Sequence, residues 1–181
     1  MNADLTSLSG GPVRVAVFGT HSQAVAEVLA ALAARRSGIP PEVSEVGDLV
    51  LARVSWKGEE GQPCIARGLL EDHHPAAIDL ALREVDAVLF VMDVQPDQLR
   101  AGWEKLMTVG ESSRREGFEL LDRPFALQYH GDDRHPGFDP DQLDAWLGFP
   151  HDRVVRGVTS SAQADQGLMD QLVGWVTKLR H

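Results

Sequence analysis

The sequence predicts a doubly wound α/β fold with a six-stranded, mostly parallel sheet and one antiparallel edge strand. Three observations lead to this prediction. Short apolar strands alternate with amphipathic helices along the 181 residues, which is typical of a parallel sheet with right-handed crossovers. The strands at 13–18 and 86–93 are almost continuously apolar, as strands buried on both faces are. A single pair of successive strands, at 46–56 and 64–70, places the antiparallel edge strand at 46–56.

The composition favours one globular domain over residues 12–181, preceded by a small, polar tail at 1–11. Asp and Glu number 27 against 17 Lys and Arg, and the net charge of −10 argues against nucleic acid and anionic membranes as partners. The single cysteine, Cys64, excludes a disulfide framework and is interpreted as a small buried hydrophobe. No apolar run could cross a bilayer, and the first residues lack the features of a signal peptide. A cytoplasmic location without membrane insertion is therefore expected.

The first helix is predicted over 22–36, directly after the strand at 13–18. Its apolar residues recur at helical spacing, and a glycine follows its last turn. Two prolines then break the chain before the strand pair, whose members are separated by a turn-rich stretch at 57–63. A second helix follows the pair, at 76–84.

From residue 86 onward, strands and helices alternate strictly. The helices carry their apolar residues on one side, and the last helix carries them on a single stripe. The strands between them are short and rich in apolar residues. These later elements are expected as helices at 97–116, 139–147 and 165–179, and as strands at 125–130 and 154–158.

This order of elements is that of a Ras-like GTPase domain, and the second half also resembles one such family in its residues. The strand at 86–93 is similar to the VDGIVFVADS strand of the bacterial gliding and polarity GTPases of the MglA family. The segment at 124–129 is similar to the family's PFVVQYNKRD strand, although His130-Gly131 replaces Asn-Lys. The resemblance implies a Ras-like P-loop GTPase fold with a vestigial nucleotide site. Its residues would be Gly19, Asp133 (the aspartate that the family places after Asn-Lys), and Ser161 and Ala162, which resemble the family's SAxxGxGV segment.

The phosphate-binding motif itself is absent. A P-loop has the pattern Gly-x-x-x-x-Gly-Lys-[Ser/Thr], because its backbone N–H groups, its lysine and its hydroxyl bind the phosphates and Mg²⁺. Counted from Gly19, the chain instead has Ala24, Val25 and Ala26 at the last three positions. The stretch at 20–23 fits a capping box, so we expect the helix to begin there and to leave no phosphate cradle.

The resemblance and these departures together predict a pseudo-GTPase that is not an enzyme and needs no cofactor. No Pro-Gly-Gln turn precedes the second helix, so no residue is assigned to water activation. We expect a protein-binding module in a motility, polarity or signalling complex, and the resemblance implies a roadblock-type, MglB-like dimer as its partner. An alternative is a weakly active GTPase that binds GTP or GDP with Mg²⁺ in an unconventional way. A hydrolase or metal enzyme on the same scaffold is a third possibility.

The partner is expected on the edge strand at 46–56, because an edge strand offers unpaired backbone groups. The predicted contact residues lie on this strand and in the segment 67–75 that follows the pair. In the alternative arrangement, the two leucines of the strand face the core and the segment at 38–45 covers the edge. The predicted contact residues are Leu49, Leu51, Trp56, Arg67, His73 and His74.

Two further patterns are open to a catalytic interpretation. The segments 72–74 and 130–135 combine histidines with carboxylates, which could hold a metal ion, but neither has the fixed helical spacing of HExxH and solvated polar loops are the better interpretation. Ser22, His21 and Asp93 could form a hydrolase triad, but no G-x-S-x-G nucleophile elbow accompanies them.

Overall fold

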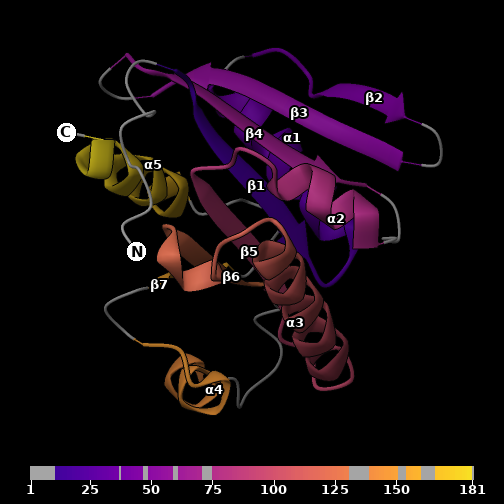
Figure 1. Cartoon of the computed structure of the whole chain (residues 1–181). Coiled ribbons are helices and arrows are strands. Elements are labelled where there is room, and N and C mark those ends of the chain that lie inside the picture. Colours follow the sequence, from indigo (N-terminus) through magenta and orange to yellow (C-terminus); the bar gives the residue numbers. More distant parts are fainter. Residues whose placement is uncertain are drawn as a thin grey trace.

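The computed structural model describes residues 11–36, 38–46, 49–58, 61–70, 75–130, 139–150, 154–159 and 166–180. These residues form an α/β fold in which five α-helices surround a mixed, mostly parallel sheet of seven strands (Figure 1). The strands are β1 (Val13–Gly19), β2 (Glu42–Val46), β3 (Leu49–Lys57), β4 (Pro63–Leu69), β5 (Ala87–Asp93), β6 (Phe125–His130) and β7 (Val154–Thr159). The helices are α1 (Ser22–Arg36), α2 (Pro75–Leu82), α3 (Leu99–Arg115), α4 (Pro140–Leu147) and α5 (Gln166–Arg180), with a short 3₁₀ helix at Leu120–Asp122.

The strands lie in the order β2-β3-β4-β1-β5-β6-β7. β1 pairs in parallel with both β4 and β5, and β6 and β7 continue the parallel part of the sheet. Among the described strands, β3 is the one that runs against the others, since it pairs antiparallel with both β2 and β4. The α/β class and the mostly parallel sheet are therefore confirmed.

The predictions of six strands and of an antiparallel edge strand at 46–56 are wrong. The antiparallel strand β3 lies inside the sheet, and β2 pairs along it from Glu42 opposite Arg53 to Val46 opposite Leu49. β2 was missed because it is short, lies just after two prolines, and has exposed side chains at residues 42–45. Short, charged strands are typical of sheet edges, and their sequences carry little apolar signal.

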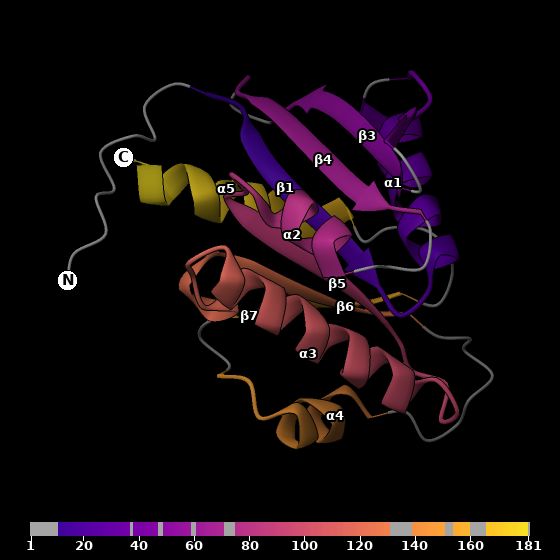
Figure 2. The same cartoon turned by 45° about the vertical axis from the view of Figure 1, so that its right-hand side comes forward.

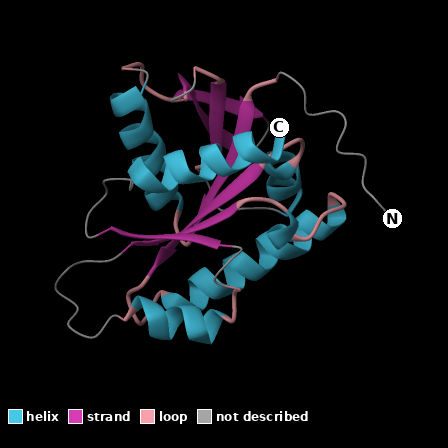
Figure 3. Cartoon of the chain, turned by 90° about the vertical axis from the view of Figure 1, so that its left-hand side faces the viewer, coloured by secondary structure: helices cyan, strands magenta, loops and turns pink. Residues whose placement is uncertain are grey.

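Helices cover both faces of the sheet (Figure 3). One apolar core lies between the sheet and the pair α1 and α5, and it contains the side chains of Val13, Val15 and Val17. The other lies under α2, α3 and α4 and contains Ala16 and Phe18. Successive residues of β1 thus alternate between two buried faces, which is why this strand is continuously apolar.

Candidate functional site

The carboxyl ends of β1 and β5 are where this sheet would present a ligand site. The chain runs from β1 to β2, β3 and β4 on one side of β1 and then crosses through α2 to β5 on the other side. In open α/β sheets, ligands bind outside the carboxyl ends of the strands where the strand order reverses in this way. Thr20 and His21 follow β1 at this point, and Asp93 ends β5 beside them. We refer to these three residues as the strand-end site.

Only two residues connect β1 to α1, because the strand ends at Gly19 and the helix begins at Ser22. The predicted early start of the helix is thereby confirmed. The backbone N–H of Thr20 donates to the carbonyl of Val91 at 2.9 Å, and its Oγ1 accepts the N–H of Asp93 at 3.0 Å. Thr20 is buried, so its N–H already has a partner in β5 and is not free to bind a phosphate.

The predicted capping box does not describe this turn. Its first residue, Thr20, bonds to β5, and the side chain of Gln23 donates from Nε2 to Oε1 of Glu27 at 3.0 Å instead of returning to the helix start. Thr20 extends the pairing of β1 with β5 by one residue, and this pairing takes the donor that the capping box would have used.

Val25, which stands where a P-loop has its lysine, is a core residue. Its side chain is fully buried, in the cluster between the sheet and α1. A Cβ added at Gly19 would lie 3.1 Å from Val25 Cγ2, and a Cβ at Gly68 of β4 would overlap Val25 Cγ1. Val25 therefore fills the space over two glycines of neighbouring strands. Because α1 begins at Ser22, a side chain at residue 25 points into the core and away from any phosphate at the strand ends.

Helix α3 closes the strand-end site from the other face of the sheet. A Cβ added at Gly102 would lie 2.7 Å from Oγ1 of Thr20 and 3.3 Å from Cγ of Met92. The helix backbone thus approaches the hydroxyl that holds the end of β5. Sequence reasoning did not find this contact, and its one signal was a glycine inside a helix, where glycine is otherwise unfavourable.

His21 and Asp93 form the polar, solvent-facing part of the site. His21 Nε2 lies 3.7 Å from Asp93 Oδ2, with the imidazole side chain 45% and the carboxylate side chain 15% exposed. The other oxygen of Asp93 accepts the N–H of Gln95 at 2.9 Å, which fixes the carboxylate. The structure thus brings together two members of the triad considered from the sequence. An imidazole beside a carboxylate can hold or pass on a proton, but this pair alone defines no substrate.

Several predicted site residues lie outside the described part of the chain. They are Asp133, Ser161 and Ala162 of the vestigial nucleotide site and His73 and His74 of the predicted partner surface. Of the two segments considered for a metal ion, 72–74 and 131–135 also lie outside it. Within the described residues, no group of three or more His, Cys, Asp or Glu side chains is placed to hold a metal ion.

The remaining predicted contact residues do not form an exposed edge. Trp56 is 6% exposed and belongs to the core on the α1 side, so its assignment as a surface contact residue is wrong. Leu51 is partly buried against the opposite core, and Leu49 is the first residue of β3. Because β2 at Glu42–Val46 pairs along β3, the structure favours the alternative in which residues 38–45 cover this strand.

Arg67 has a structural role in this fold. Its Nη2 donates to the carbonyl of Arg83, just after the last turn of α2, where a helix leaves carbonyls unpaired. Burial, together with the nearby positive charges of Arg14 and Arg53, lowers the pKa of the Arg67 guanidinium. Cys64 is buried in β4, in agreement with its interpretation as a small hydrophobe.

A scan against protein-family models matches none of them, and a search of curated proteins finds no match. The class of the protein therefore rests on its fold, which is compatible with both Rossmann-like and P-loop architectures. Among the described residues, the structure contains no helix with the length and apolar character needed to span a membrane.

Proposed function

We propose that this protein is a catalytically inactive, MglA-like member of the small GTPases that binds a protein partner without needing a nucleotide. The observation that carries the proposal is the two-residue connection between Gly19 and Ser22, together with the burial of Val25. A P-loop needs a longer, glycine-rich connection whose N–H groups remain free for phosphate.

The order and direction of the strands support descent from a Ras-like domain. Within the described chain, strands and helices alternate from β4 onward in the element order that the resemblance implies, whereas β2 is an additional strand between α1 and the antiparallel β3. The two segments that resemble the MglA family fall on β5 and β6, which are parallel neighbours in the sheet. The family-like residues thus lie in the scaffold, whereas the differences lie at the strand ends.

The binding free energy that the missing P-loop groups would supply is large enough to favour no nucleotide binding over weak binding. Each hydrogen bond to a charged group contributes about 1.5–3 kcal/mol. Loss of the lysine, the hydroxyl and the cradle, with the Mg²⁺ that they support, removes about 6 kcal/mol or more, which is about four decades in affinity. Without γ-phosphate to order switch loops, partner binding would be constitutive.

The edge strand that the structure contains is the best-supported surface for a partner, such as a roadblock-type dimer. Among the described strands, β2 pairs with β3 on one side, so its outer side offers backbone groups for strand addition. Val43 on β2 and Ile39 just before it are 56% and 69% exposed, and they would supply apolar contacts.

A binding assay with roadblock proteins from the same genome tests this surface. We expect Val43→Asp and Ile39→Asp each to weaken capture at least about tenfold, since a buried, unpaired carboxylate opposes association. Leu179→Asp is the matched control, because Leu179 is also 59% exposed but lies on α5. The proposal is contradicted if binding of the roadblock protein requires added GTP. It is also contradicted if both edge variants are folded and still bind the roadblock protein as the wild type does.

The nucleotide content of the purified protein separates the proposal from a weakly active GTPase. Protein purified without added nucleotide is denatured, and the supernatant is analysed by ion-exchange chromatography. We expect less than about 0.05 guanine nucleotide per chain, as for a site with a dissociation constant far above micromolar. Stoichiometric GDP or GTP would favour the GTPase alternative.

A further inference from the structure

A partly exposed aromatic and apolar surface lies on α3 and α4. It consists of Trp103 and Met107 on α3 and Trp146 on α4, and we refer to it as the Trp face. Met107 is 40% and Trp146 is 59% exposed, and the rings of Trp103 and Trp146 lie 5.5 Å apart at 57°. Figure 2 shows α3 and α4 on the same side of the sheet. Tryptophan and methionine are enriched at protein interfaces, so this surface is a candidate for one.

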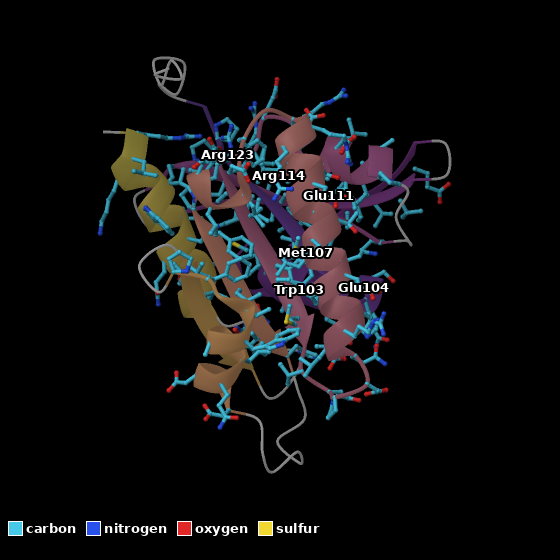
Figure 4. All side chains as sticks on the ribbon, turned by 60° about the horizontal axis from the view of Figure 1, so that its bottom comes forward. Trp103, Glu104, Met107, Glu111, Arg114 and Arg123 are labelled. Carbon is cyan, nitrogen blue, oxygen red and sulfur yellow. The ribbon has the colours of Figure 1, made fainter. Side chains whose placement is uncertain are left out.

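The exposed charges of α3 form one stripe that runs past the Trp face. Arg100, Glu104, Glu111 and Arg114 are spaced by four, seven and three residues, with Met107 in the middle, so all five lie along one side of the helix. Figure 4 shows Glu104, Met107, Glu111 and Arg114 along α3. The side chains of Arg100, Glu104 and Arg114 are 88%, 62% and 53% exposed.

This stripe can pair its charges with those of a second copy in an antiparallel register centred near the Trp face. With the two-fold axis between Glu104 and Met107, Arg100 of each copy lies opposite Glu111 of the other, so the ion pair occurs twice. In the same register, the exposed Asp97 before α3 lies opposite Arg114. Trp103 and Met107 then lie near the axis, where anchoring side chains of interfaces are found, and Glu104 of each copy lies opposite Met107 of the other.

The charges also disfavour an antiparallel register that is centred on Met107. If the axis passed through Met107, Arg100 would face Arg114 and Glu104 would face Glu111, and both like-charged pairs would be repulsive. A shift of the axis toward the helix carboxyl end would pair Glu104 with Arg114 but move Trp103 and Trp146 to the rim. Of the registers that keep Trp103 near the axis, the one with its axis between Glu104 and Met107 therefore forms the most pairs of opposite charge.

The charge pairs within the chain do not compete strongly with this arrangement. Arg100 bonds Glu104 at 2.9 Å, and Arg114 bonds Glu119 at 3.1 Å, with more than half of each side chain exposed. Such surface ion pairs contribute less than about 1 kcal/mol, so the arginines can be shared with a second copy. The net charge of −10 opposes association, but at physiological salt it is screened beyond about 8 Å, whereas the facing pairs are in contact.

We infer that the chain forms a two-fold symmetric dimer through antiparallel α3 helices, with the Trp face at its centre and Arg100 paired with Glu111 of the other copy. The occupant of this face is thus a second copy of the same chain. The inference is independent of the proposed function, since it uses neither the strand-end site nor β2.

Sedimentation equilibrium of the full chain over about 1–200 μM measures the dimer constant. We expect Arg100→Glu and Glu111→Arg each to weaken the dimer at least about tenfold, because each variant places like charges opposite one another. An equimolar mixture of the two variants should recover dimer, since every facing pair in the heterodimer has opposite charges. Trp146→Ala should weaken the dimer by a similar factor. Lys57→Glu on β3 is the control, because it reverses an exposed charge outside the proposed interface, and it should leave the dimer constant unchanged.

Three results would overturn the inference, provided that circular dichroism shows each variant to be folded. The first is a wild-type chain that stays monomeric up to about 200 μM. The second is a wild-type dimer whose constant is unchanged by Trp146→Ala and by both charge variants, which would place the interface elsewhere. The third is a mixture of the two charge variants that dimerises no better than either variant alone.

Discussion

At the scale of single residues, Val25 carries the proposal that this protein does not bind a nucleotide. In a P-loop, the residue at this position carries a cation toward phosphate, but here it packs over Gly19 and Gly68. The difference does not lie in the side chain alone, because α1 begins directly after the two-residue connection. A lysine at this position would therefore be buried in the core.

We predict that Val25→Lys destabilises the fold by about 4 kcal/mol at pH 7. Lysines in apolar cores have pKa values of about 5–6 against an ordinary value of about 10.4, and one pKa unit corresponds to about 1.4 kcal/mol. The unfolded chain binds the additional proton, so stability should rise by about 1.4 kcal/mol per pH unit between pH 7 and 9. Urea denaturation at several pH values measures both effects.

Gln23→Lys is the matched control for this substitution, because Gln23 lies in the same turn of α1 but is exposed. Its stability should change by less than about 0.5 kcal/mol and show no added slope with pH. A Val25→Lys variant that is as stable as this control would mean that residue 25 can reach solvent, and the account of the strand-end site would be wrong.

At the scale of elements, the close approach of α1 to the sheet depends on Gly68. A Cβ there would overlap Val25, lie 3.0 Å from the carbonyl oxygen of Val17 and lie 3.1 Å from Leu29. We predict that Gly68→Ala destabilises the fold by about 1–3 kcal/mol, since the core has no room for the methyl group. Thermal or urea unfolding measures the loss.

Gly174→Ala in α5 should change the free energy of unfolding in the opposite direction. Nothing lies within 4 Å of a Cβ at Gly174, so the alanine should stabilise the helix by about 0.5–1 kcal/mol. If both glycine variants changed stability in the same direction, the assignment of a packing role to Gly68 would fail.

Most elements could be predicted from the sequence, because apolar periodicity reports burial directly. The expected ranges for α1 and β6, 22–36 and 125–130, are those of the structure. The exception is the region of β2 and β3, where the sequence pattern predicts one strand at 46–56 and the structure has two. Edge strands have little buried surface, so their positions depend on pairing partners that the local sequence does not contain.

The candidate site was predictable in part. The absence of a P-loop motif after β1 is visible in the sequence, and the burial of Val25 follows from its place among the apolar residues of α1. The contacts of Thr20 are not visible there, since the hydrogen bond from Asp93 joins residues 73 positions apart. Such pairing depends on the order of strands in the sheet, and local patterns do not determine that order.

At the scale of the whole molecule, Arg180 joins the end of the last helix to the start of the first strand. Its Nη2 donates to Asp86 Oδ2 at 2.8 Å and to the carbonyl of Pro12 at 3.1 Å, and Asp86 also accepts the N–H of Arg14 at 2.7 Å. The side chains of Arg180 and Asp86 are 14% and 8% exposed, so the ion pair is largely buried.

We predict that Asp86→Asn destabilises the fold by about 3 kcal/mol, because it leaves a buried guanidinium without its counter-charge. Asp86→Asn combined with Arg180→Met should cost less than the sum of the two single changes, as expected for directly coupled groups. Glu84→Gln is the control, since the Arg14–Glu84 pair is exposed and should contribute less than about 1 kcal/mol. Additive losses in the double variant would contradict this pairing.

We propose that the end of β1 does not bind nucleotide phosphates, and isothermal titration calorimetry with GDP and GTP in the presence of Mg²⁺ measures this binding. The full chain at about 100 μM should give no saturable heat with either nucleotide, which corresponds to a free energy of binding weaker than about −7 kcal/mol. A 1:1 isotherm with a dissociation constant below about 10 μM for either nucleotide would contradict the account.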